Sequence, residues 1–477
     1  MFFCIYLFMF ILPRHGRLFL AVFSAVLGNF TFGFALVFPS PVIPQLQKGE
    51  DPRLQMDIHQ ISWFGSVFTL GAAFGGISAM VLNDRVGGKI SIMLSGVPSV
   101  VGLLVMGAAQ NFWMLLWARF LTGIAGGITA GSIPVSYLDC SFGVLGSYPQ
   151  ITAVFGSLAL YALGLVLPWR WLAVAGEIPV VIMIILLCFM PTSPRYHVMK
   201  GNRAKAVKSL EWLRGPSSDY LTEFNKIERS INSQVKGGAK WSDLKKPLYY
   251  KPILISVFMR FLQQMTGITP ILVYLEPIFH MTAISLELKY DAALVGVVRL
   301  MSVVIAASLM DKAGRKALLF TSGFLMYIAT LSMTMYTHKT PCSHGNLTVT
   351  EGLKSTYGGS TGPAFDPITL ITLISSMFMC WGPITLLLMS EILPLGARGV
   401  ASGLCVGVSW ITAFILTQLF MHVVEAYGLF APFLFFCVVS VVNIIFTAKC
   451  VPETKGRTLE EIKNYFRTGR TFTILDA

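Results

Sequence analysis

Two short charged segments with nearly the same sequence lie between apolar stretches, one in each half of the chain. Residues 84–89 read Asp-Arg-Val-Gly-Gly-Lys, and residues 311–316 read Asp-Lys-Ala-Gly-Arg-Lys. Acidic and basic side chains this close together act as local anchors and salt bridges, which contribute little each at a wet surface. Repetition at matching positions favours a further role, because two halves that move against each other need contacts that form and break. In the first copy Gly88 replaces Arg315, which removes a guanidinium able to bind carboxylates bidentately.

A second pair of segments supports this internal repeat. Pro-Thr-Ser-Pro-Arg at 191–195 corresponds to Pro-Glu-Thr-Lys-Gly-Arg at 452–457, and parallel repeats of this kind build two-bundle membrane proteins. Glu391 is followed seven residues later by Arg398, which would supply another contact of the same kind. We therefore expect a charged gate on one side of the molecule, and we expect the loss at Gly88 to weaken its closed state.

Polar side chains also occur inside apolar stretches, where they suit binding rather than catalysis. Gln263 and Gln264 are adjacent, and uncharged amides can both donate and accept hydrogen bonds with a bound molecule. Hydrogen bonding between helices is the alternative reading of this pair. Arg299 lies midway along another apolar run, where an arginine is either functional or a structural partner facing the bundle interior.

The sequence offers no nucleophile with a base, no phosphate-binding loop and no metal-ligand set, so we expect no enzyme, no cofactor and no metal site. The glycines Gly123, Gly127 and Gly131 recur every four residues. Small residues at that spacing let helix backbones approach closely, and we read them as packing positions.

Composition indicates that the chain is dissolved in a lipid bilayer. Of 477 residues, 55% are hydrophobic and 12% charged, and the mean hydropathy is +0.69. One soluble core cannot hide that much apolar surface. The net charge of +13 lies in short joints between apolar runs rather than on a face with interleaved aromatic residues, so no nucleic-acid partner is expected.

Twelve apolar runs are long enough to cross a membrane, which requires about 20 residues. They lie at 17–38, 62–82, 90–110, 113–137, 148–168, 171–191, 252–274, 292–310, 317–337, 367–389, 399–421 and 428–450. The predicted fold is an all-α integral membrane protein with twelve transmembrane helices in two six-helix bundles. The predicted divisions are an N-terminal segment 1–16, the bundles 17–191 and 252–450, a cytoplasmic linker 192–251 and a cytoplasmic tail 451–477.

Positive charge predicts the orientation. The linker 192–251 is rich in Lys and Arg, which places it and both termini in the cytoplasm. Within the linker, Leu221, Phe224, Ile227 and Ile231 share one helical face, which indicates an amphipathic helix against the bundle or a solvated linker helix. Asn346 opens an Asn-Leu-Thr sequon in an external loop and is the expected glycosylation site.

Several motifs resemble one known family. Ala-Arg-Phe-Leu-Thr-Gly at 118–123, Gln-Gln-Met-Thr-Gly-Ile-Thr-Pro at 263–270 and Val-Pro-Glu-Thr-Lys-Gly-Arg at 451–457 are similar to those of the sugar porter family of the major facilitator superfamily. Among its members, the class III facilitative hexose transporters are the most similar. The resemblance implies the major facilitator fold and uniport of a hexose such as glucose by alternating access.

The same resemblance implies two sets of functional residues. The expected sugar-binding residues are Gln150, Gln263, Gln264, Thr269, Tyr274, Arg299 and Trp410. The expected cytoplasmic gate comprises Asp84, Arg85, Lys89, Arg119, Arg195, Asp311, Arg315, Lys316, Glu391, Arg398, Glu453 and Arg457.

The chain also departs from the family pattern. Ala35 stands where proton-coupled sugar porters carry an Asp in the first helix, so proton coupling through that position is not expected. Thr269 replaces an Asn, and Leu386 replaces a Trp of the tenth helix. The tenth helix and the turn around Asp139 are shorter than in relatives, which motivates an alternative: a transport-inactive, sugar-porter-like protein or sugar sensor. The sequence leaves open the sugar, the oligomeric state, and whether the plasma membrane or an endosomal or lysosomal membrane holds the protein.

Overall fold

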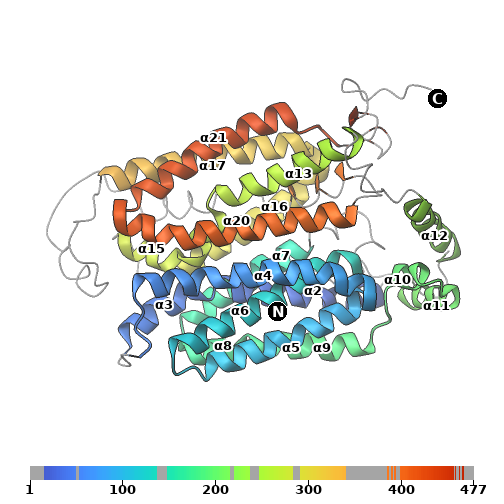
Figure 1. Ribbon diagram of the computed structural model, residues 1–477, viewed down its shortest axis with the longest axis horizontal. Coiled ribbons are helices and arrows are strands. Elements are labelled where there is room, and N and C mark those ends of the chain that lie inside the picture. Colours follow the sequence, from blue (N-terminus) through green and yellow to red (C-terminus); the bar gives the residue numbers. More distant parts are fainter. Residues whose placement is uncertain are drawn as a thin grey trace.

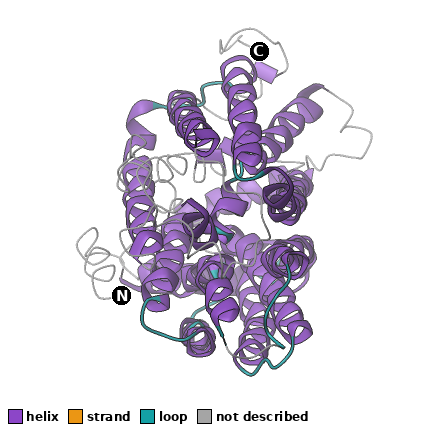
Figure 2. Ribbon diagram, turned by 90° about the vertical axis from the view of Figure 1, so that its left-hand side faces the viewer, coloured by secondary structure: helices purple, strands orange, loops and turns teal. Residues whose placement is uncertain are grey.

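The computed structural model describes residues 16–49, 53–136, 148–214, 220–236, 247–282, 290–339 and 398–455, and also 384, 385, 388, 389, 392, 393, 457, 461, 465 and 466. Every regular element in these ranges is a helix. Figure 1 shows the helices of the first half below those of the second half, and Figure 2 looks along the bundle, with most helices close to end-on.

The first half supplies eight helices to the bundle within the described ranges. They are α2 (Gly16–Val37), α3 (Pro39–Lys48), α4 (Ile58–Val86), α5 (Gly88–Gly107), α6 (Phe112–Ser136), α7 (Tyr148–Gly164), α8 (Trp169–Ala175) and α9 (Glu177–Phe189). The basic linker adds α10 (Pro194–Met199), α11 (Arg203–Arg214) and α12 (Tyr220–Lys236). In α12, Phe224 is buried against Ala206 and Leu210 of α11, so the linker helices pack on one another.

The second half continues the pattern. Its described helices are α13 (Pro247–Met265), α14 (Ile268–Val273), α15 (Leu275–Thr282), α16 (Tyr290–Ala313), α17 (Arg315–Lys339), α20 (Arg398–Tyr427) and α21 (Phe430–Cys450). Each of the first nine predicted spans and the last two coincides with one or more described helices. The predicted tenth span lies largely outside the described residues. Of the described helices, 9 are long and apolar enough to cross a membrane.

One predicted span is broken in the structure. The sixth passes from α8 into α9 through Gly176, whose φ of −66° and ψ of −18° keep the backbone helical. The seventh divides into α13 and α14 at Gly267, whose φ of +83° is a left-handed conformation that favours glycine. A Cβ on Gly267 would also meet the Phe436 ring, with Cδ2 at 2.6 Å. The break follows directly after the two glutamines and turns the chain from α13 into α14.

The apolar core differs between the two ends of the bundle. The largest cluster joins residues of both halves and includes members of α3, α14 and α15, among them Val42, Ile271 and Ile278. The other two bundle clusters each belong to a single half: one is built around Leu319 and Leu388, and the other around Ile92 and Leu187.

These clusters define the names of the two ends. We call the end with α3 and α15 the sealed end, because the halves share a core there. The opposite end carries Asp84–Lys89, Arg315, Lys316 and the linker helices, which extend beyond the bundle in Figure 1, and we call it the latch end.

Glycines set the distance between helices in the first half. A Cβ on Gly127 of α6 would overlap the carbonyl oxygen of Ala72 in α4 and lie 2.8 Å from the Gly76 nitrogen. Gly123 meets the Phe68 carbonyl in the same way, and Gly131 meets the Ala79 side chain at 2.9 Å. Backbone approach of this kind requires residues without side chains at the contact, so the packing interpretation of this glycine stripe holds.

Candidate functional site

A buried amide cluster lies at the α13–α14 break. The side chain of Gln264 is 7% exposed and engages both ends of its amide. Its Nε2 donates to Ser409 Oγ of α20 at 3.0 Å, and its Oε1 accepts from Thr269 Oγ1 of α14 at 2.8 Å. Gln263 Oε1 accepts from Thr385 Oγ1 at 3.1 Å and also from Arg260 Nη1. The cluster therefore joins the break to two other parts of the second half.

Sequence reasoning missed three members of this cluster. Arg260, Thr385 and Ser409 all contact the predicted glutamines, but none was expected at the site. Arg260 could have been found, because it precedes Gln263 and Gln264 by three and four residues, and such pairs share a helix face. Thr385 and Ser409 come from distant segments, and no local sequence pattern predicts that they contact the glutamines.

An aromatic pair brings the first half to this cluster. Trp410 follows Ser409 in α20, and its ring centroid lies 5.4 Å from that of Phe32 in α2, at an interplanar angle of 75°. Phe32 also packs against Phe68 of α4 at 5.8 Å. Edge-to-face aromatic contacts present C–H and π surfaces, as the apolar face of a sugar ring requires. The amide cluster thus adjoins the interface between the halves.

The other expected sugar-binding residues lie elsewhere along this interface. Tyr274 is fully buried toward the sealed end, where its hydroxyl lies 3.3 Å from the Ser62 carbonyl of α4 and its ring stacks on Phe420 at 5.7 Å. Gln150 is half-buried near the start of α7. Arg299 is buried in α16, facing the Tyr161 phenol of α7. Tyr274 and Arg299 therefore contribute to contacts between the halves.

Arg119 lies at the sealed end, apart from the expected gate residues. It is in the second turn of α6, which begins at Phe112 after the sealed-end turn. Its side chain is 0% exposed; Nη1 donates to the Ala35 carbonyl and Nε to the Phe64 carbonyl at 3.4 Å. The guanidinium also lies 4.8 Å from the Phe68 ring centroid. This arginine ties α6 to α2 and α4, because its donors satisfy backbone carbonyls of those helices.

At the latch end, the second half holds its charged turn with a carboxylate. Glu453 Oε1 accepts from the Arg315 backbone nitrogen at 2.9 Å, and Oε2 accepts from the Lys316 nitrogen at 3.0 Å. These are the first N–H groups of α17, so the carboxylate caps that helix at its positive end. Lys316 Nζ donates to the Ala448 carbonyl at 2.9 Å. Gly314, at φ +90°, packs directly against Glu453.

The first half repeats this arrangement without the carboxylate. Gly87 has φ +85° and corresponds to Gly314, and Lys89 Nζ donates to the Met190 carbonyl at 2.6 Å. Tyr196 of α10 donates its hydroxyl to the Arg85 carbonyl at 3.0 Å. The repeat places Thr192 where the second half has Glu453. The first half has therefore lost both the arginine and the carboxylate of the second-half turn.

For the remaining expected gate residues, the structure gives the exposure of some side chains and does not describe others. Asp84 and Arg457 are exposed and Arg195 is half-buried. The side chains of Asp311 and Arg398 lie outside the description, as do Glu391, the sequon at Asn346, residues 1–12 and the shortened turn around Asp139.

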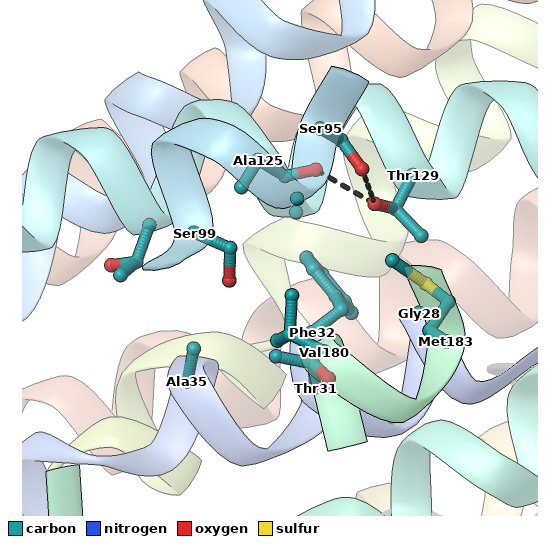
Figure 3. A pocket seen from close by; sticks show the side chains of 13 residues that line it. Gly28, Thr31, Phe32, Ala35, Ser95, Ser99, Ala125, Thr129, Val180 and Met183 are labelled. Carbon is teal, nitrogen blue, oxygen red and sulfur yellow. Dashed lines mark hydrogen bonds between the residues drawn. The ribbon is translucent and has the colours of Figure 1, made fainter. Parts of the chain in front are cut away.

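Two cavities are lined by residues other than those of the amide cluster. One cavity lies within the first half and has a volume of about 20 Å³. It is lined by residues that include Thr31, Ala35, Ser95, Ser99 and Thr129 (Figure 3). Ser95 and Thr129 share a hydrogen bond of 2.8 Å there. A volume of this size fits about one water molecule, so this cavity cannot hold a sugar.

The other cavity is a wider cleft of about 340 Å³ at the latch end, lined by residues that include Pro191, His197, Lys205 and Lys208. Burial, and then the charge of Lys205, lowers the pKa of His197.

Helical halves that share a core at one end and keep separate cores at the other, with a polar cluster at their interface, define a membrane protein of the major facilitator fold. The proton:xylose symporter XylE bound to 6-bromo-6-deoxy-D-glucose matches with a TM-score of 0.76 at 21% identity, covering 94% of this chain and 99% of that chain. The inward open conformation of XylE from E. coli matches with a TM-score of 0.74 at 20% identity, over 94% of this chain and 99% of that one. These likenesses show the fold.

The family follows from sequence comparison. The family model described as "Sugar (and other) transporter" matches residues 21–466. The human solute carrier family 2, facilitated glucose transporter member 6 is 53% identical over 96% of this chain and 92% of its own. Member 8 of the same carrier family from Bos taurus is 38% identical over 95% of each chain. The chain belongs to the sugar transporter family, and the expected family and fold are confirmed.

Proposed function

We propose that the protein carries a hexose such as glucose across a membrane by facilitated transport. The observation that carries this proposal is the amide cluster of Gln263 and Gln264 beside the interface of two halves whose described residues share a core at the sealed end. A neutral polyol suits uncharged amides and hydroxyls with an aromatic wall, which Trp410 and Phe32 supply. The printed names of the relatives, which are facilitated glucose transporters, support the choice of sugar.

Alternating access gives the two ends different roles. The halves rock about the sugar, so that contacts at one end form as those at the other break. In the described conformation, Ser66 Oγ of α4 donates to Gln418 Oε1 of α20 at 2.5 Å, and Tyr161 donates to the Leu272 carbonyl at 3.1 Å. Both contacts cross between the halves. We propose that they open in the opposite state, and that Arg119 organises this sealed end rather than the cytoplasmic gate.

Uniport without proton coupling is part of the proposal. Ala35 offers only a backbone carbonyl at the position where proton-coupled relatives carry a carboxylate, and that carbonyl accepts from Arg119. No other residue of α2 is acidic. Hexose uptake into liposomes is therefore expected to be the same with and without an imposed pH gradient. Sugar accumulation that follows the gradient would contradict uniport.

The asymmetry of the latch end leads to a prediction about the conformational balance. The double substitution Gly88→Arg with Thr192→Glu is expected to favour the state closed at the latch end by about fivefold or more. The carboxylate caps α5 and holds the turn, and the guanidinium gains a partner across the halves only when the latch end closes, where a hydrogen bond between charged groups contributes about 1.5–3 kcal/mol. A cysteine at Met80, which faces Gly403 across the halves, reports the closure as slower reaction with a thiol reagent added from the latch side.

The single variants are the matched controls for the latch. Each restores one partner only, so each is expected to shift the cysteine reaction less than the double variant does. If the double variant reacts at the wild-type rate, these turns are membrane anchors and the latch proposal is wrong.

We also propose that the latch end, the linker helices and both termini face the cytoplasm, which the many basic residues of the linker support. Asn346 is then on the opposite side and glycosylated. Asn346→Gln is expected to remove the mobility shift that a glycosidase produces on the wild-type protein. Retention of that shift would contradict Asn346 as the modified residue.

A further inference from the structure

The membrane-spanning part of the chain carries an imbalance of buried charge. The twelve apolar runs contain a single carboxylate, Glu177, but three arginines lie deep within them: Arg119, Arg260 and Arg299. All three are at least nine-tenths buried, with exposed fractions of 0%, 7% and 8%. A buried charge is costly unless nearby groups compensate it. Such arginines need partners, and carboxylates of the protein are almost absent from the spans.

Arg119 is compensated at two of its three nitrogens, and its Nη2 is buried with no hydrogen-bond partner among the described residues. Its donors reach the Ala35 and Phe64 carbonyls, and its guanidinium lies over Phe68. Carbonyl dipoles and aromatic faces both stabilise a guanidinium. These contacts account for Arg119 as a structural residue.

Arg260 is compensated less well. Nη1 donates to Gln263 Oε1, but Nε is buried and has no hydrogen-bond partner among the described residues. The arginine lies one helical turn before Gln263 and Gln264, so its charge adjoins the amides that we propose to bind sugar.

Arg299 adds a second cation on the same half. It faces the Tyr161 phenol, and Glu276 of α15 acts on that same phenol. The apolar runs of the second half therefore hold two buried arginines and no carboxylate, which favours an anionic over a cationic cargo beside them.

We propose that the sugar site prefers a hexose with one anionic group, and that Arg260 binds that group while the glutamines bind the hydroxyls. This inference rests on the proposed function and names its substrate class. A guanidinium binds a carboxylate or a phosphate with paired hydrogen bonds. A hexuronate and a hexose phosphate share this chemistry, and the experiment separates them. The site still admits glucose, because the amides serve both sugars.

The test compares glucose, glucuronate and glucose 6-phosphate with the purified full-length protein. In liposomes, unlabelled glucuronate or glucose 6-phosphate is expected to inhibit labelled glucose uptake at concentrations at least tenfold below those of unlabelled glucose. Arg260→Gln keeps a hydrogen-bonding side chain but removes the charge. It is expected to abolish the tenfold preference. Arg260→Lys keeps the charge and is expected to retain part of the preference.

The matched control is Arg170→Gln, the same change at an exposed arginine over Trp169, which is expected to leave the preference unchanged. A second readout does not need a variant. Uptake of labelled glucuronate or glucose 6-phosphate by the wild-type protein is expected to rise when the liposome interior is made positive, and glucose uptake is not. The anion that both inhibits glucose uptake and is itself taken up into the liposomes shows whether the site prefers a carboxylate or a phosphate.

A binding measurement distinguishes failure of this inference from failure of the proposed function. If no sugar is transported but glucuronate or glucose 6-phosphate raises the melting temperature of the wild type and not of Arg260→Gln, the inference stands and transport fails. If glucose is transported and neither anion competes better than glucose, the inference is overturned and transport stands. If Arg260→Gln unfolds, with wild-type anion preference and potential dependence both absent, Arg260 is a structural residue only.

Discussion

Replacing Gln264 by leucine is expected to lower hexose uptake about a hundredfold. The amide joins three helices through Ser409 and Thr269, at 3.0 and 2.8 Å, and leucine leaves both hydroxyls buried without this partner. A buried group that loses its partner costs about 1–3 kcal/mol, and a site built to hydrogen-bond a substrate hydroxyl discriminates strongly when that bond is lost. Initial rates of labelled glucose uptake into liposomes measure the effect.

Gln110→Leu is the matched control, because Gln110 is exposed at the sealed end and the same change should leave uptake unaltered there. Melting temperatures of both variants show how much of the effect is structural. Wild-type uptake by Gln264→Leu would mean that the pair only joins helices, which is the alternative reading of its sequence.

The second large effect concerns folding. Gly127→Ala is expected to leave most of the protein aggregated, because the added Cβ overlaps the Ala72 carbonyl and lies 2.8 Å from the Gly76 nitrogen. Those are backbone atoms of α4, so the whole helix must shift, and overpacking costs about 1–3 kcal/mol or more. Size-exclusion chromatography after detergent extraction measures the monodisperse fraction.

Gly407→Ala provides the comparison for this substitution. Gly407 is a glycine of α20, and a Cβ built there meets nothing within 4 Å. The control is expected to behave as the wild type does. Equal monodisperse fractions for the two alanine variants would show that the α4–α6 contact tolerates a methyl group and that the packing account is wrong.

The sequence predicted most of the fold because apolar length is a strong signal. Each of the first nine spans and the last two falls on described helices, and the glycine stripe lies at a close helix contact. The break at Gly267 was not predicted, because an apolar run has the same composition whether or not its backbone turns. The chain turns at Gly267 because a left-handed φ is available to glycine. The sequence alone does not show which glycine adopts it.

The candidate site was less predictable than the fold. The glutamines were named from their motif, but Arg260 was overlooked one turn away, and Ser409 meets them only through the tertiary fold. Arg119 was expected at the cytoplasmic gate. A motif assigns a residue to a helix but not to an end of it, and the structure places this arginine at the sealed end.

The latch end shows what internal comparison adds. Gly88 was recognised as the position of the missing arginine. Thr192 was not recognised as the position of the missing carboxylate. The contact of Glu453 with the Arg315 and Lys316 nitrogens shows that the two segments act together, so the first half lacks both partners.

Uptake of labelled glucose by the purified protein in liposomes, with the proton gradient collapsed by an ionophore, tests the central claim most directly. Facilitated uniport predicts saturable uptake that stops when the internal and external glucose concentrations are equal, and that accelerates when the liposomes are preloaded with unlabelled glucose. Uptake that does not saturate, or that is absent while the protein remains folded by its melting curve, would contradict this account.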